Sequence, residues 1–213
     1  MQITKIEVQK KNKYRYSLYS NDIFLFGISE NTLIKFAISK DRDYSDNDLK
    51  EIQAYEQVSR CLEQSYRFLR RRSHLQNELR RKLRQKKYLD HEIDAAIKIL
   101  QEKKYLDDVI YIKQFIKDAV NIKKTGPLLI LKKLLEKGAQ RRHTEDILND
   151  NYSECQQLKN AAFHAQKKRK ALKDEDPPAI RQKLFAYLKQ KGFETDIILS
   201  VLPDETEQFD ESG

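Results

Sequence analysis

Apolar positions recur at helical spacing along most of the chain, and the same arrangement returns about every fifty residues. Three pairs of apolar residues show it, each pair separated by four positions: Leu79 with Leu83, Ile130 with Leu134, and Leu184 with Leu188. A fixed period of this length, on one face of a helix, is typical of stacked helical repeats. The sequence therefore predicts a mainly α fold, in which three tandem three-helix repeats form an elongated curved solenoid.

Residues 1–44 follow a different pattern, which predicts a small cap at the N-terminal end of the repeats. Three short β-prone runs are separated by turn residues: 3–8, 14–19 and 23–26. The first turn is the basic cluster Lys10-Lys11-Asn12-Lys13. This spacing predicts a three-stranded β-meander whose third strand ends at Gly27. A short helix over 30–38 is predicted to cover the sheet with three apolar residues: Leu33, Ile34 and Ala37.

Start and stop signals of helices divide the rest of the chain. Four side chains are predicted to cap helix starts: Ser45, Ser73, Asp90 and Asp107. Pro127 is predicted at the first position of a helix, and Gly138 at a left-handed helix end. These signals predict five parts: the cap 1–44, the repeats 45–106, 107–152 and 153–202, and a tail 203–213. The tail is acidic and lacks periodicity, so we expect it to be disordered.

The charge of the chain is positive and unevenly distributed. Lys and Arg number 42 against 33 Asp and Glu, which gives a net charge of +9. Between Arg67 and Lys104 there are thirteen basic residues against five acidic ones. Such a concentration favours an anionic partner, either nucleic acid or an acidic protein surface. The alternative interpretation is a solvated helix face without a partner.

The basic residues of the first two repeats form the candidate interface. Arg80, Arg84 and Lys87 are predicted to lie on one line of their helix, where guanidinium groups could bind phosphates or carboxylates. Twelve residues make up the predicted partner-binding and nucleic-acid-binding site: Arg70, Arg71, Arg72, Arg80, Arg81, Arg84, Lys86, Lys87, Lys132, Lys133, Arg141 and Arg142. Three tyrosines lie between them in the sequence and could stack on bases or belong to the core: Tyr66, Tyr88 and Tyr105.

Residue patterns for catalysis are weak. The five glycines are scattered singly, so no phosphate-binding loop is predicted. The four histidines have no metal-pair spacing and are expected at surface or capping positions. Cys61 and Cys155 lie in apolar-periodic segments and are expected to be buried thiols. We therefore predict no enzyme activity, no catalytic residue, no metal and no cofactor.

Targeting signals are also weak. The first residues lead into an alternating pattern rather than the apolar run of a signal peptide. No stretch reaches the ~18 consecutive apolar residues that a membrane helix needs. The chain is therefore predicted to be cytoplasmic and without membrane contact. We also expect a monomer.

Several short motifs of the sequence resemble those of a known family. Arg72-Ser73, Glu78-Leu79 and Lys82-Leu83 resemble a signature of the RecX family, regulators of the RecA recombinase. The block 104–108 is similar to that family's Gly-Tyr-Leu-x-Asp element, with Lys104 in place of the usual Gly. Residues 135–138 match its Lys-Gly element, and the resemblance runs from about residue 50 to 202.

The resemblance implies a function as well as a fold. Members are understood to lie in the groove of the RecA filament on single-stranded DNA. There they limit filament growth, strand exchange and co-protease activity, in recombinational DNA repair and the SOS response. The expected partners are thus the RecA filament and single-stranded DNA, with double-stranded DNA as a further possibility. Two alternatives stay open at this stage: a DNA-binding repeat protein that acts without RecA, and a metal-dependent nuclease.

Overall fold

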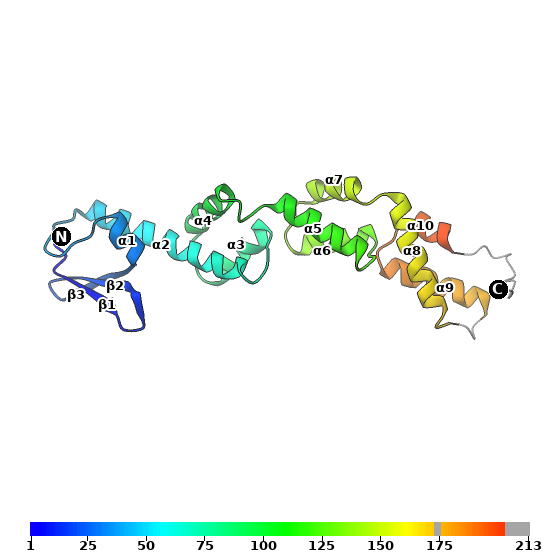
Figure 1. Ribbon diagram of the computed structural model, residues 1–213, viewed down its shortest axis with the longest axis horizontal. Coiled ribbons are helices and arrows are strands. Elements are labelled where there is room, and N and C mark those ends of the chain that lie inside the picture. The colour runs from blue at the N-terminus through cyan, green and yellow to red at the C-terminus, as the bar shows by residue number, and fades with distance from the viewer. Residues whose placement is uncertain (173–175, 203–213) are drawn as a thin grey trace. The chain divides into compact units, whose positions relative to one another are not determined.

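The computed structural model describes residues 1–172 and 176–202, and this part of the chain is mainly helical with one small sheet (Figure 1). The strands are β1 (Lys5–Gln9), β2 (Asn12–Ser20) and β3 (Ile23–Ser29). Ten helices follow in the described residues: α1 (Glu30–Lys35), α2 (Asp46–Leu69), α3 (Gln76–Gln85), α4 (Asp90–Glu102), α5 (Asp108–Asn121), α6 (Pro127–Glu136), α7 (Arg141–Asn151), α8 (Glu154–Arg169), α9 (Pro177–Gln190) and α10 (Thr195–Val201). The predicted helical fold with an N-terminal β-meander is confirmed. The acidic tail 203–213 lies outside the described residues.

The chain divides into two compact units. The first contains Met1–Ser73 and Leu79–Leu106. The second contains His74–Glu78 and the described residues from Asp107 onward. The first turn of α3 thus belongs to the second unit, although the rest of that helix belongs to the first.

The three strands form an antiparallel sheet in the order β1-β2-β3. Its third strand continues past Gly27 to Ser29, because the Ser29 hydroxyl accepts the Thr32 N–H at 3.3 Å and so begins α1 directly. The helix is shorter than predicted and ends at Lys35. Ala37 then adopts a left-handed conformation with φ of 45°. Ile34 and Ala37 are exposed, so the prediction that they cover the sheet was wrong.

A buried carboxylate joins the sheet to α2. Glu56, only 2% exposed, accepts hydrogen bonds from the Ser29 N–H (2.9 Å), the Ser29 hydroxyl (3.0 Å) and the Thr32 hydroxyl (2.6 Å). The Arg15 guanidinium lies 2.9 Å from its other oxygen. A buried charge is stable only when it is paired and hydrogen-bonded, and this set meets both conditions. The network fixes the N-terminal segment on the long helix.

The helix starts of the first unit differ in part from the prediction. Ser45 caps α2 in a capping box with Asp48, as predicted. Ser73 does not cap α3, which begins only at Gln76. Asp90 is the first residue inside α4 rather than its cap. Helix α4 starts after Leu89, and the Leu89 N–H donates to the Glu92 carboxylate at 2.9 Å.

The first amide of α3 finds its acceptor far along the chain. The Gln76 N–H donates to the Asp108 carboxylate at 2.8 Å, and both residues belong to the second unit. Asp107 itself caps α5, accepting the Ile110 N–H at 3.0 Å. Two neighbouring aspartates therefore serve two different helices.

The second unit contains two buried clusters of apolar side chains. One is formed mainly by α5, α6 and α7 and includes Leu75, Ile112, Ile116, Ile130 and Leu134. The other is formed by α8, α9 and α10 and includes Ala161, Leu184, Leu188, Phe193 and Ile198. Pro127 opens α6, Gly138 has φ of 99° after that helix, and Ser153 caps α8. The apolar positions at repeat spacing thus lie in the cores of successive helix groups.

Candidate nucleic-acid interface

The predicted arginines Arg70, Arg71 and Arg72 directly follow α2 and are exposed to solvent. The last carbonyl groups of a helix carry a partial negative charge, which favours basic side chains at this position. Arg70 is the C-cap, and the Arg72 guanidinium donates to the Ser73 carbonyl at 2.9 Å. All three arginines therefore lie at the surface of the first unit, at the end of α2.

Two arginines of α3 already have acidic partners on α4. Arg80 forms an ion pair with Asp94, and Arg84 Nε lies 2.7 Å from Asp90 Oδ1. The hydrogen bond from Arg84 lowers the pKa of the Asp90 carboxyl, and the same contact raises the pKa of Arg84. A phosphate that binds either guanidinium would have to replace or join a carboxylate.

The predicted line Arg80, Arg84 and Lys87 is broken at its end. The helix stops at Gln85, and Lys87 lies beyond it with φ of 68° in the left-handed region. The prediction that Lys87 continues the helical line was therefore wrong. Arg81, Lys86 and Lys87 are exposed, and the structure of the described residues shows no ion pair to any of the three.

In the second unit, the predicted basic residues lie on α6 and at the start of α7. Lys132 and Lys133 are exposed on α6, and Arg142 is exposed on α7. Arg141 pairs with Glu145 one turn further on, at 3.0 Å. The twelve predicted residues are thus divided between the two units, eight in the first and four in the second.

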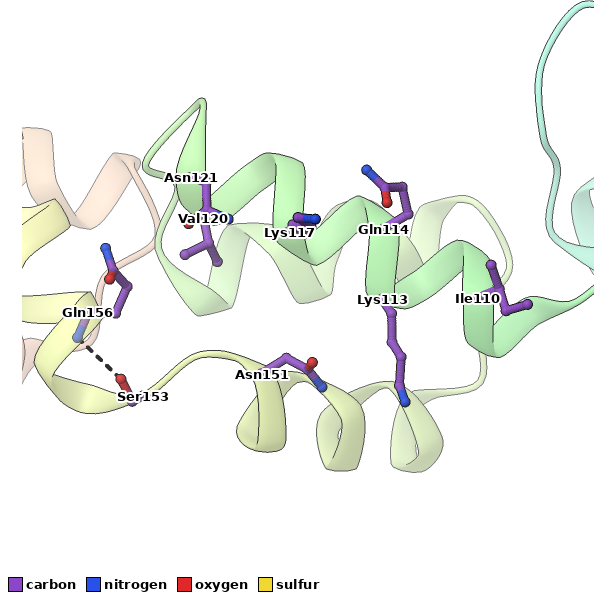
Figure 2. Close-up of a pocket in the computed structure, with 9 residues that line it drawn as sticks. All are labelled: Ile110, Lys113, Gln114, Lys117, Val120, Asn121, Asn151, Ser153 and Gln156. Atoms are coloured by element: carbon purple, nitrogen blue, oxygen red, sulfur yellow. Dashed lines mark hydrogen bonds between the residues drawn. The ribbon is translucent and has the colours of Figure 1, made fainter.

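A polar groove in the second unit was not predicted from the sequence. It has a volume of about 490 Å³ and lies between α5 and the chain from the end of α7 to the start of α8 (Figure 2). Lys113 and Lys117, one turn apart on α5, contribute its positive charges. Figure 2 shows the Lys113 side chain pointing across toward α7. The rest of the lining is mostly amides and a hydroxyl: Gln114, Asn121, Asn151, Ser153 and Gln156.

The chemistry of this groove suits an anionic or carbonyl-bearing partner. None of the residues that line it is acidic. Ser153 and Gln156 are already joined by the cap of α8, at 3.4 Å. The spacing of Lys113 and Lys117 was visible in the sequence, but their convergence with α7 and α8 depends on tertiary packing.

The three interleaved tyrosines belong largely to the packing of the first unit. Tyr66 and Tyr105 form an edge-to-face pair with ring centroids 5.4 Å apart. Tyr66 and Tyr88 are partly buried against the core of that unit, and the Tyr88 hydroxyl donates to the Arg60 carbonyl at 3.2 Å. Tyr105 keeps 61% of its surface exposed. The core interpretation therefore holds for the first two rings.

Two predictions, one for the histidines and one for the cysteines, were wrong. His74 and His164 are buried rather than at the surface, and burial lowers the pKa of His164. Cys155 is exposed, whereas Cys61 is buried as predicted. Burial raises the pKa of the Cys61 thiol to about 12, so this thiol is unreactive at neutral pH.

The described residues offer neither a metal cluster nor a membrane-spanning helix. No group of three or more His, Cys, Asp or Glu side chains there could hold a metal ion. Among the helices of that part, none combines the length and apolar character needed to cross a membrane.

The fold and the surface define a class of protein: a helical repeat protein with exposed basic side chains. Comparison with known families gives a narrower assignment. A model described as the regulatory protein RecX N-terminal domain matches residues 1–44. A second, described as the third three-helix domain of RecX, matches residues 154–202.

Individual relatives agree with these family models. The regulatory protein RecX of Clostridium beijerinckii is 33% identical over 205 residues, which cover 94% of this chain and 93% of the relative. That of Listeria monocytogenes is 29% identical over 99% of this chain and 78% of the relative. A crystal structure of regulatory protein RecX has the same fold, with a TM-score of 0.77 at 21% identity over 94% of this chain and 98% of that one. The chain belongs to the RecX family of regulatory proteins.

Proposed function

We propose that this chain is a non-enzymatic modulator, mainly an inhibitor, of the RecA recombinase. In this role it binds the RecA filament on single-stranded DNA and limits filament extension, strand exchange and co-protease activity. Membership of the RecX family is the observation that supports this function most strongly. The partners of the protein are then the RecA filament and the DNA strand within it.

The unpaired basic residues of the first unit support a contact with such a filament. Arg71, Arg81 and Lys86 are exposed and have no acidic partner among the residues that the structure describes, so a new anion does not have to displace one of these. A RecA filament on DNA offers phosphates, and binding through phosphates weakens steeply with salt. We assign these three residues the largest part of the contact, and Arg80 and Arg84 a smaller part because each is already paired.

The test measures the ATP hydrolysis of RecA on single-stranded DNA with increasing amounts of the protein. The wild type is expected to inhibit hydrolysis, and the variant with Arg71→Gln, Arg81→Gln and Lys86→Gln is expected to inhibit much less. A matched control removes three exposed lysines elsewhere in the first unit, through Lys50→Gln, Lys98→Gln and Lys103→Gln. Circular dichroism should show equal helix content in all three proteins.

Two results would contradict the proposal. If the wild type leaves ATP hydrolysis and filament length unchanged, the chain does not modulate RecA. If it binds naked single-stranded DNA tightly and a RecA filament does not alter that binding, the chain is a DNA-binding protein that acts without RecA. Equal inhibition by the variant and the control would retain the function but exclude these three residues as the contact.

A further inference from the structure

A second basic surface lies in the first unit, where the N-terminal sheet meets α2. Strand β2, helix α2 and the chain after α3 line a groove of about 190 Å³. Its charged lining comprises Arg15, Arg60 and Arg67 against a single acidic residue, Glu63. None of these arginines belongs to the twelve predicted residues.

Two of the arginines are positioned to bind a partner. Arg60 and Arg67 lie seven residues apart on α2, which places them on one face of the helix and about 10 Å apart along its axis. Both are exposed, and neither forms an ion pair in the part of the chain that the structure describes. Glu63 lies between them in sequence but pairs with neither. Arg71 lies just beyond the end of α2, so the predicted arginine cluster follows this helix directly in the chain.

The third arginine forms a fixed wall of the groove. Arg15 lies 2.9 Å from the buried Glu56 carboxylate and donates to the Gly27 carbonyl at 3.3 Å. Its side chain is only 19% exposed, and its charge is balanced by Glu56. Arg15 therefore shapes the groove, and the binding charge comes from α2.

An aromatic ring and an amide complete the lining. Tyr88 is partly buried, and its hydroxyl is held by the main-chain carbonyl of Arg60. This bond fixes the ring beside the two arginines of α2 without using their side chains. Gln64 adds an amide that could donate and accept hydrogen bonds.

The basic turn of the β-hairpin lies next to the same groove. Asn12 lines it, and Lys11 and Lys13 are its immediate neighbours in the chain. Lys10 and these two lysines are exposed. The positive surface thus extends from the hairpin turn along α2.

We propose that this groove binds the sugar–phosphate backbone of a single-stranded nucleic acid. Arg60 and Arg67 bind phosphates, the ring of Tyr88 supports an unstacked base, and the hairpin lysines extend the contact along the strand. Guanidinium groups beside an aromatic ring are the combination that single-strand-binding grooves use. The groove is smaller than the ~300 Å³ of the smallest ligand pockets, which suits a polymer that crosses it rather than an enclosed small molecule. The inference rests on the proposed function, since it gives the N-terminal segment a contact with the DNA strand.

The test uses the full chain without RecA. Fluorescence anisotropy of a labelled oligothymidylate is measured with the wild type, with Arg60→Gln/Arg67→Gln, and with the control Lys50→Gln/Lys98→Gln, which removes the same charge. Two lost phosphate contacts are expected to weaken binding by about 25-fold at 0.1 M salt, and to make the slope of log affinity against log salt shallower by about 1.4. Tyr88→Leu is expected to weaken binding with the salt slope unchanged, because it removes stacking and no charge.

The outcomes separate this proposal from the proposed function. Equal affinity of the arginine variant and the control, or no binding by the wild type, would overturn the groove as a nucleic-acid site. The groove proposal would also be overturned if the arginine variant lost binding to a labelled polyglutamate peptide but kept its binding to oligothymidylate. That result would assign the groove to an acidic protein segment. If the wild type inhibits RecA in any of these cases, the proposed function is retained. A failure of RecA inhibition with intact groove binding would contradict only the proposed function.

Discussion

Gly126 and Gly192 lie in direct main-chain contact. The Gly126 N–H donates to the Lys191 carbonyl at 2.9 Å, and the Leu128 N–H donates to the Gly192 carbonyl at 3.0 Å. A Cβ on Gly126 would overlap the carbonyl group of Gly192, and one on Gly192 would overlap Leu129. The end of α9 and the start of α6 therefore meet backbone to backbone, with no space for a side chain.

Gly138 also lies close to another helix, in this case to a side chain of α3. The Asn77 side-chain amide donates to the Gly138 carbonyl at 2.8 Å, and a Cβ on Gly138 would lie 2.8 Å from the Cβ of Asn77. Gly138 and Gly192 both have positive φ, which L-residues adopt only at a cost. The two glycines thus satisfy a backbone requirement and a packing requirement at once.

The first prediction concerns Gly192→Ala. The substitution combines a left-handed conformation with overlap on Leu129, so the free energy of unfolding should fall by about 2–4 kcal/mol. Urea unfolding followed by circular dichroism measures this loss. Gly27→Ala is the control, because its φ is not positive and the added Cβ meets mainly the flexible end of Gln9. A loss below about 0.5 kcal/mol for Gly192→Ala would show that the backbone contact is not rigid.

The second prediction concerns a helix end where the chain lacks a glycine. Lys104 follows α4 with φ of 58°, and the Tyr105 N–H donates to the Leu100 carbonyl at 2.9 Å, as in a helix end that favours glycine. Lys104→Gly should therefore stabilise the fold by up to about 1 kcal/mol, measured by thermal unfolding. Lys103→Gly, at a residue with φ of −82°, should destabilise it instead. Equal effects of the two substitutions would contradict this.

The third prediction concerns the pH dependence of stability at Asp108. Burial raises the pKa of this carboxyl, although the hydrogen bond from Gln76 opposes the shift. The folded chain therefore holds the proton to higher pH than the unfolded chain. The contribution of this group to stability is present below the unfolded pKa and is lost as pH rises through the folded pKa.

Two substitutions of Asp108 separate this charge effect from the hydrogen bond. Asp108→Asn keeps an acceptor for the Gln76 N–H and cannot ionise, so its stability relative to the wild type should increase from pH 3 to pH 6. Asp108→Ala removes the acceptor and should cost about 1 kcal/mol. Urea unfolding across that pH range provides the measurement. A constant difference between wild type and Asp108→Asn would mean that the carboxyl titrates alike in the folded and unfolded states.

The fourth prediction concerns the competition between Asp90 and a polyanion for Arg84. The pKa of Asp90 lies below its usual value because Arg84 donates to it, so Arg84→Gln should raise that pKa. Addition of oligothymidylate to the wild type should raise it as well, because phosphates then engage the guanidinium. Carboxyl NMR titration reports both changes.

Asp48 provides an internal reference in the same spectra. The pKa of Asp48 is lowered by hydrogen bonds from Ser45 and not by Arg84. It should therefore stay unchanged on substitution of Arg84. An Asp90 pKa that does not respond to oligothymidylate would remove Arg84 from the interface.

The helices, the β-meander and several helix starts could be predicted because their causes are local. Apolar spacing decides which face of a helix is buried, and Leu79, Leu83 and Leu134 are indeed fully buried. Ser45 and Asp107 each cap a helix by accepting the amide three residues further on, so short-range sequence contains the information.

Several of the errors have a different cause, because they depend on residues distant in sequence or on how helices pack. The start of α3 is capped by Asp108, 32 positions along the chain, so Ser73 was a false signal. The polarity of the charged residues was enough to predict that most of them are exposed. The pairing of Arg80 with Asp94 could not be predicted, because it depends on how α3 packs on α4.

The sequence by itself determined the helical repeat, its N-terminal sheet and the local concentration of positive charge, since these follow from composition and short-range periodicity. Only the tertiary structure decided which arginines are paired, which glycines approach another backbone, and where Arg60, Arg67 and Tyr88 meet. Such convergence depends on the orientation of packed elements. Distances between side chains on different elements cannot be derived from their spacing along one chain.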